Sequence, residues 1–109
     1  MKRDHGESSN IGRDELKRAT EVERELLRIE DRYHELIAKV SAQSLGKTSV
    51  FRELDELQAE QLELRIRVAD ARGANTLHAI YCDALDLRID ALLGLDGLVR
   101  RKMRERASS

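Results

Sequence analysis

The chain contains no proline and only six glycines among 109 residues. Because these two residue types most often interrupt helices and form tight turns, their scarcity favours long, continuous helices. Charged residues make up 38% of the chain and hydrophobic residues 40%, a balance typical of amphipathic helices with an exposed side. The composition therefore predicts an all-α fold in a single domain.

Aromatic residues account for only 3% of the chain, and the formal net charge is −1. The core must therefore be built from aliphatic side chains. Proteins that bind single-stranded nucleic acid use aromatic residues to stack the bases, and such residues are nearly missing here. A nucleic-acid partner is not expected.

Cysteine is also scarce, since Cys82 is the only one. It cannot form a disulfide within the chain, and one cysteine with three histidines falls short of the usual zinc ligand sets. No metal or cofactor is expected. The first ten residues contain no apolar run resembling a signal peptide, and no apolar stretch approaches the about 18 residues of a membrane span. We expect a soluble, cytoplasmic protein.

A long first helix is predicted from residue 12 to about residue 43, after a polar segment, residues 1–11, that we expect to be a flexible leader. Its apolar positions alternate three and four residues apart, as in a coiled-coil heptad. These positions are Ala19, Val22, Leu26, Ile29, Tyr33, Leu36 and Val40. The charges between them mix both signs and predict a solvated face.

The second helix is predicted over residues 49–72, after a turn in the sequence SAQSLGKTS and a cap at Thr48 or Ser49. Its repeating positions contain a single polar member, Gln61; they are Val50, Leu54, Leu57, Gln61, Leu64, Val68 and Ala71. Gly73 should end this helix in the left-handed conformation.

The third helix is predicted over residues 75–101, capped by Asn75 or Thr76 and followed by a basic tail, residues 102–109. One broad arc of this helix is rich in large aliphatic residues, and Arg88 points into its middle. The arc consists of Leu77, Ile80, Tyr81, Ala84, Leu85, Leu87, Ala91, Leu92, Leu95, Leu98 and Val99. An arc this wide must pack against at least two other helices.

Simple antiparallel folding of the three helices places Glu30, Gln61 and Arg88 at one height. A buried guanidinium needs a carboxylate partner, so the three residues form a coherent group. Two interpretations remain open. The group is either a buried polar layer that fixes the helix register, or a pocket for a small anionic ligand, anchored by Arg88 and oriented by Gln61.

The layout is also similar to that of the all-helical chorismate mutases. The features that carry this resemblance are the helix order over residues 20–98, Arg32 on the long first helix, the Arg52-Glu53 pair opening the second, and Gln61 and Arg88 inside. The resemblance implies a pocket in which cationic side chains hold a dicarboxylate. Gln43 or Ser44 stands where that family has a lysine late in the first helix.

Taken together, these patterns predict an antiparallel three-helix bundle, a helical hairpin plus a third helix, completed by homodimerisation. Everything identifiable is a helix seam, a cap or a solvated charge. We therefore expect a small non-enzymatic module that acts through helix–helix contacts with a protein partner. The alternative hypothesis is a helical enzyme similar to chorismate mutase that binds an anionic ligand through Arg88, Gln61, Glu30, Arg32 and Arg52.

Overall fold

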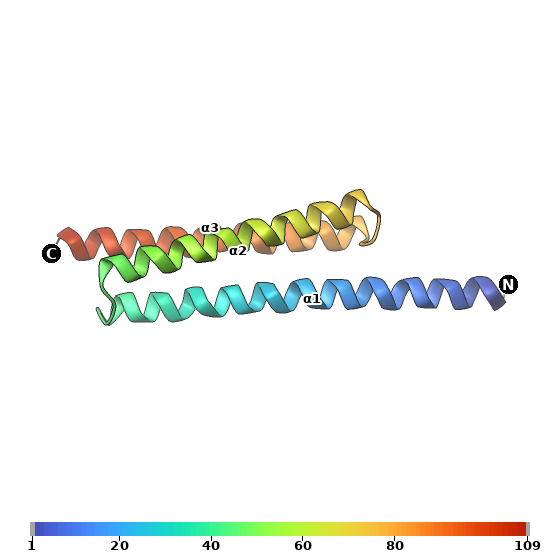
Figure 1. Ribbon diagram of the computed structural model, residues 1–109, viewed down its shortest axis with the longest axis horizontal. Helices are drawn as coiled ribbons and strands as arrows, with labels where there is room; N and C mark the ends of the chain where they lie inside the picture. The colour runs from blue at the N-terminus through green and yellow to red at the C-terminus, as the bar shows by residue number, and fades with distance from the viewer. Residues whose placement is uncertain (1, 109) are drawn as a thin grey trace.

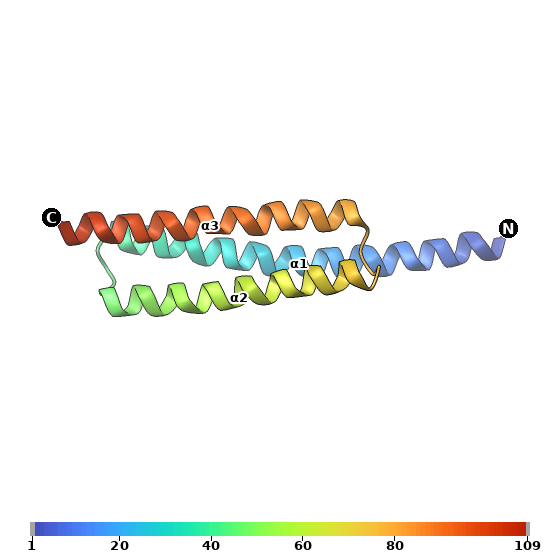
Figure 2. The same ribbon diagram turned by 90° about the horizontal axis from the view of Figure 1, so that it is seen from above.

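The computed structural model describes the backbone of residues 2–108 and the side chains of residues 13–106. Three helices make up the fold: α1 (Lys2–Ser41), α2 (Lys47–Gly73) and α3 (Ala79–Ser108). Successive helices run antiparallel, and every pair of helices is in contact (Figures 1 and 2). The result is a rod of 69 × 20 × 17 Å. The predicted all-α, antiparallel three-helix bundle is confirmed.

The core forms along the predicted seams of α1 and α2. All seven seam positions of α1, from Ala19 to Val40, are buried. In α2 the buried positions run from Val50 to Val68, with Ala71 packed partly against them. Full burial of a leucine-sized side chain stabilises the folded state by about 1.5–3 kcal/mol, so these two seams supply much of the stability of the bundle.

The seam of α3 differs from the predicted arc. The buried positions of this helix again alternate three and four residues apart; they are Cys82, Leu85, Ile89, Leu92, Asp96, Val99 and Met103. The prediction was wrong for several residues of the arc that are exposed: Ile80, Tyr81, Ala84, Leu87 and Ala91. α3 carries two sets of mainly apolar residues on different faces. The buried set includes Asp96, so its regular spacing is not apparent from the apolar residues alone.

The ends of two helices also differ from the predicted bounds. α3 continues past Arg101 to Ser108, because Val99 and Met103 extend its buried seam into the basic segment. The predicted end of helical order near Arg101 was wrong. α1 is assigned from Lys2, but no side chain before residue 13 is described. The flexibility of the leader therefore stays a prediction.

The turns use other residues than the sequence suggested. Gln43 and Asn75 have positive φ angles of 56° and 57°, whereas no described glycine does, so Asn75 takes the left-handed role predicted for Gly73. α2 begins after Gly46, without a side-chain cap. At the start of α3 the backbone N–H of Ile80 donates to His78 Nδ1 at 3.2 Å, in place of a cap from Asn75 or Thr76.

Along the described part of the chain, none of the helices combines the length and the apolar character required to cross a membrane.

Candidate functional site

Arg88 lies at the edge of the α1–α3 interface rather than inside the core. Its Nη2 atom is 3.3 Å from Glu30 Oε1, so the predicted pairing of these two side chains is present. The Arg88 side chain is 40% exposed and that of Glu30 is 29% exposed. Arg88 was expected to be buried because the arc was centred on the wrong side of α3.

Gln61 is buried at 4% exposure, as its seam position requires, but it joins neither charged residue of the expected layer. Its Oε1 atom is buried and accepts no hydrogen bond within the described residues. An unpartnered buried oxygen costs about 1–3 kcal/mol. The expected three-residue layer is thus reduced to a half-exposed ion pair and a separate buried amide.

The other two candidate cations point elsewhere. Arg32 lies between α1 and α2, where it contacts Glu60 at 2.6 Å and Glu56 at 3.3 Å. Arg52 is exposed on α2. None of the cavities described for the chain is lined by Arg32, Arg52 or Arg88. The structure does not bring these guanidinium groups together around one pocket.

A buried polar network that the sequence did not reveal connects all three helices. The Tyr33 hydroxyl of α1 donates to Asp96 Oδ2 at 3.0 Å, and Arg100 Nε donates to Asp96 Oδ1 at 2.6 Å. The Arg100 guanidinium also lies over the Phe51 ring of α2, 5.9 Å from its centre. Burial, reinforced by the Asp96 hydrogen bond, raises the pKa of the Tyr33 phenol well above its ordinary value.

The signal for this network was the spacing of Asp96 within α3. It lies four residues after Leu92 and three before Val99, in phase with the buried seam. A carboxylate at such a position needs hydrogen-bond donors. Both oxygens of the Asp96 carboxylate accept a hydrogen bond within the bundle, so the network is a structural element that fixes the helix register.

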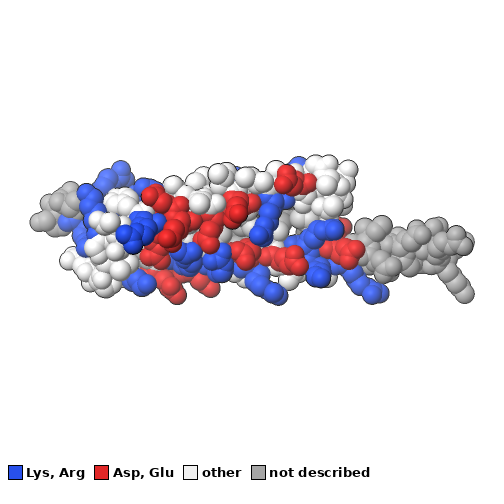
Figure 3. All heavy atoms as spheres, in the orientation of Figure 1, with Lys and Arg blue, Asp and Glu red and all other residues white. Residues whose placement is uncertain are grey.

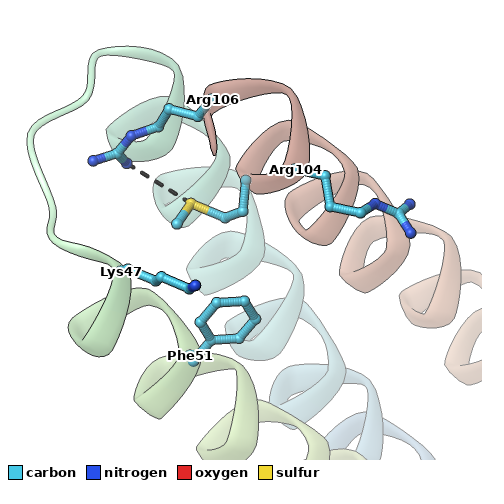
Figure 4. A pocket seen from close by; sticks show the side chains of 5 residues that line it. Lys47, Phe51, Arg104 and Arg106 are labelled. Carbon is cyan, nitrogen blue, oxygen red and sulfur yellow. Dashed lines mark hydrogen bonds between the residues drawn. The ribbon is translucent and has the colours of Figure 1, made fainter. Parts of the chain in front are cut away.

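A cavity of about 240 Å³ lies at the end of the bundle where α3 ends and α2 begins. Lys47 and Phe51 of α2 line it together with Met103, Arg104 and Arg106 of α3 (Figure 4). Arg106 Nη2 donates to the Leu45 carbonyl oxygen at 2.9 Å, while Arg104 points away from Phe51 (Figure 4). The lining cations do not converge on one point, and the hydrogen bond of Arg106 joins α3 to the connection between α1 and α2.

Cys82 is buried, and its Sγ atom is 3.8 Å from the Leu77 carbonyl oxygen. Burial raises the pKa of the Cys82 thiol, which disfavours the reactive thiolate. Among the described residues, no group of three or more histidine, cysteine, aspartate and glutamate side chains is arranged to hold a metal ion.

The most unusual surface of the molecule is the side of α3 that faces away from the core. We call it the outer stripe; it consists of Ile80, Ala84, Leu87, Ala91, Gly94 and Leu98. Ile80 and Leu87 are each 71% exposed, and Leu98 is half-buried. An uncharged strip is visible along the edge of the molecule where α2 and α3 lie (Figure 3).

The spacing of the outer stripe is four, three, four, three and four residues, so its members follow a second heptad phase along about 27 Å of helix. Leu62 of α2 and Leu93 of α3 lie together beside it and line a small cavity. They are 58% and 55% exposed. The outer face of α2 and α3 thus carries apolar side chains in a pattern suited to contact with another helix.

The fold and this surface define a class: a small antiparallel three-helix bundle with a second, exposed helix seam. No protein-family model, curated protein or solved structure matches the chain.

Proposed function

We propose that this chain is a non-enzymatic interaction module that binds a protein helix through the outer stripe of α3. The observation that carries the proposal is the heptad spacing of exposed apolar residues, with Ile80 and Leu87 each 71% exposed. Scattered surface leucines need no explanation, but a continuous apolar stripe marks an interaction surface. A helix is the fitting partner because residues at this spacing interdigitate with those of a second helix.

The alternative enzyme hypothesis receives no such support. An enzyme similar to chorismate mutase needs cationic side chains that converge on a dicarboxylate. Here Arg32 is held by Glu60 and Glu56, Arg88 faces Glu30, and Arg52 is exposed elsewhere. Three guanidinium groups on separate surfaces cannot orient one small substrate.

Site-specific photo-crosslinking tests the proposal. A photoreactive phenylalanine analogue is placed at Leu87, and separately at His34, an exposed residue of α1 outside the outer stripe. In the source cell, the Leu87 variant should give a discrete crosslinked protein product that the His34 variant lacks. The same product from both positions, or none from Leu87, would contradict the proposed docking surface.

A further inference from the structure

Building on the proposed function, we propose that the helix bound by the outer stripe is α3 of a second copy of this chain, running antiparallel. In the proposed register, Leu87 lies opposite Leu98 of the partner subunit, and Ala91 lies opposite Gly94 of the partner subunit. The twofold axis then passes between the two Ala91–Gly94 layers. The same surface patch serves both copies, as in any isologous dimer.

Gly94, the glycine of the outer stripe, points to close approach by another backbone. A Cβ atom built on Gly94 or Gly97 would meet nothing within 4 Å, so packing within the chain does not require either glycine. Each costs about 1 kcal/mol relative to alanine inside a helix. A second helix that crosses close to Gly94 and Ala91 gives the small residues a role, with the Leu87–Leu98 layers closing the contact on each side.

The charges of α3 select the antiparallel direction. Near its start, α3 carries Asp83 and Asp86 and no lysine or arginine before Arg88. Both aspartates contact one guanidinium, that of Arg72, at 3.0 Å and 2.8 Å, so acidic charge is in excess along this part of α3. Near its end, Arg101 and Lys102 follow each other, and basic side chains gather at this end of the molecule (Figure 3). An antiparallel pair brings acidic start and basic end together, whereas a parallel pair sets like charges side by side.

The same charges select the register. With Leu87 opposite Leu98, Ala84 faces Arg101 of the partner subunit, and Asp83 lies on the flank of α3 that meets Arg104 of the partner subunit. A shift of one heptad would instead place Ile80 opposite Leu98. That shift would bring Asp90 beside its own copy and move the basic residues away from Asp83, so the electrostatic term favours the first arrangement.

Disulfide trapping with a mixture of two variants, each of which carries one added cysteine beside the buried Cys82, tests this arrangement. Ala84→Cys and Arg101→Cys both change exposed positions, so both variants should fold, which circular dichroism checks. After mild oxidation, a mixture of the two variants should form a mixed disulfide, and neither variant alone should dimerise covalently. The wild-type chain is the control, because its only cysteine, Cys82, is buried.

Three results would overturn the inference. Self-crosslinking of Ala84→Cys alone would indicate a parallel pair, and crosslinking of Ala84→Cys to Gly94→Cys in place of Arg101→Cys would indicate the shifted register. No disulfide from any mixture would remove the second copy as the partner. The proposed function would survive this last result if Leu87 still photo-crosslinks to a different protein, so the two failures are distinguishable.

Discussion

Asp96 is the residue on which the three helices converge. It accepts hydrogen bonds from Tyr33 of α1 and from Arg100 of its own helix, and Arg100 in turn lies over Phe51 of α2. Asp96 is only 5% exposed. Its buried carboxylate is tolerated because each of its oxygens accepts a hydrogen bond. Its position therefore fixes how far each helix is shifted along the others.

Tyr33 gives the bundle a predictable response to alkaline pH. Its pKa is raised in the folded state, whereas the phenol of the unfolded chain ionises near pH 10. The native state therefore keeps its proton more tightly, and the free energy of unfolding should fall as the pH rises above about 10. Urea titrations of the wild-type chain and of Tyr33→Phe should show a smaller decline in the variant. An equal decline in the free energy of unfolding of both proteins would mean that ionisation of Tyr33 does not cause the loss of stability.

Arg88 should contribute little to stability. Its ion pair with Glu30 is 3.3 Å long and lies between side chains that are 40% and 29% exposed, and exposed pairs contribute about 0–1 kcal/mol. Arg88→Ala should therefore lower the free energy of unfolding by less than about 1 kcal/mol, with a small coupling to Glu30→Gln in a double-mutant cycle. A loss of about 3 kcal/mol or more would indicate a buried pair instead.

At the scale of the helices, the predictability of each element followed from the number of apolar seams it carries. α1 has one dominant seam, and every one of its predicted positions is buried. α2 followed the prediction at every position except Ala71, which is only partly buried, and the buried positions include Gln61. α3 has two seams in different phases. Periodicity alone favours the face with more large aliphatic residues as the buried one. The contact between Tyr33 and Asp96 decides which seam of α3 is buried. These two residues are 63 positions apart in the chain, so their contact leaves no local pattern in the sequence.

The candidate site was predictable to the same limited extent. The pairing of Glu30 with Arg88 could be derived from antiparallel folding because both residues lie at matched heights. Their exposure could not, since it depends on which seam of α3 is buried. For the same reason the outer stripe, whose residues other than Gly94 had been assigned to the core, was not recognised as a surface.

A substitution at Gly97 tests whether the second half of α3 is helical. Because a Cβ atom at this position would meet nothing within 4 Å, Gly97→Ala should add helix propensity without a steric cost. The free energy of unfolding should rise by about 1 kcal/mol. Ala59→Gly, at an exposed position of α2, is the reciprocal control and should lower it by a similar amount. A destabilising Gly97→Ala would mean that another backbone already occupies this space.

The whole molecule is a rod whose long sides differ in character. Between α1 and α2 the surface is bridged by charged contacts of Arg28 and Arg32 with Glu60, whereas the far side of α3 carries the outer stripe. A monomer keeps this apolar surface in water, and a dimer removes it. Because association adds its free energy to folding, the melting temperature of a dimer should rise with protein concentration.

Sedimentation equilibrium at high micromolar concentration tests the central claim most directly. The wild-type chain should sediment at twice its 12.5 kDa mass. Leu87→Arg should be a folded monomer, since Leu87 is 71% exposed and contributes little to the core. The matched control is Leu27→Arg on α1, which changes a leucine that is 50% exposed and outside the outer stripe, and it should remain dimeric. A wild-type monomer, or a Leu87→Arg variant that is still a dimer, would contradict an interface on the outer stripe of α3.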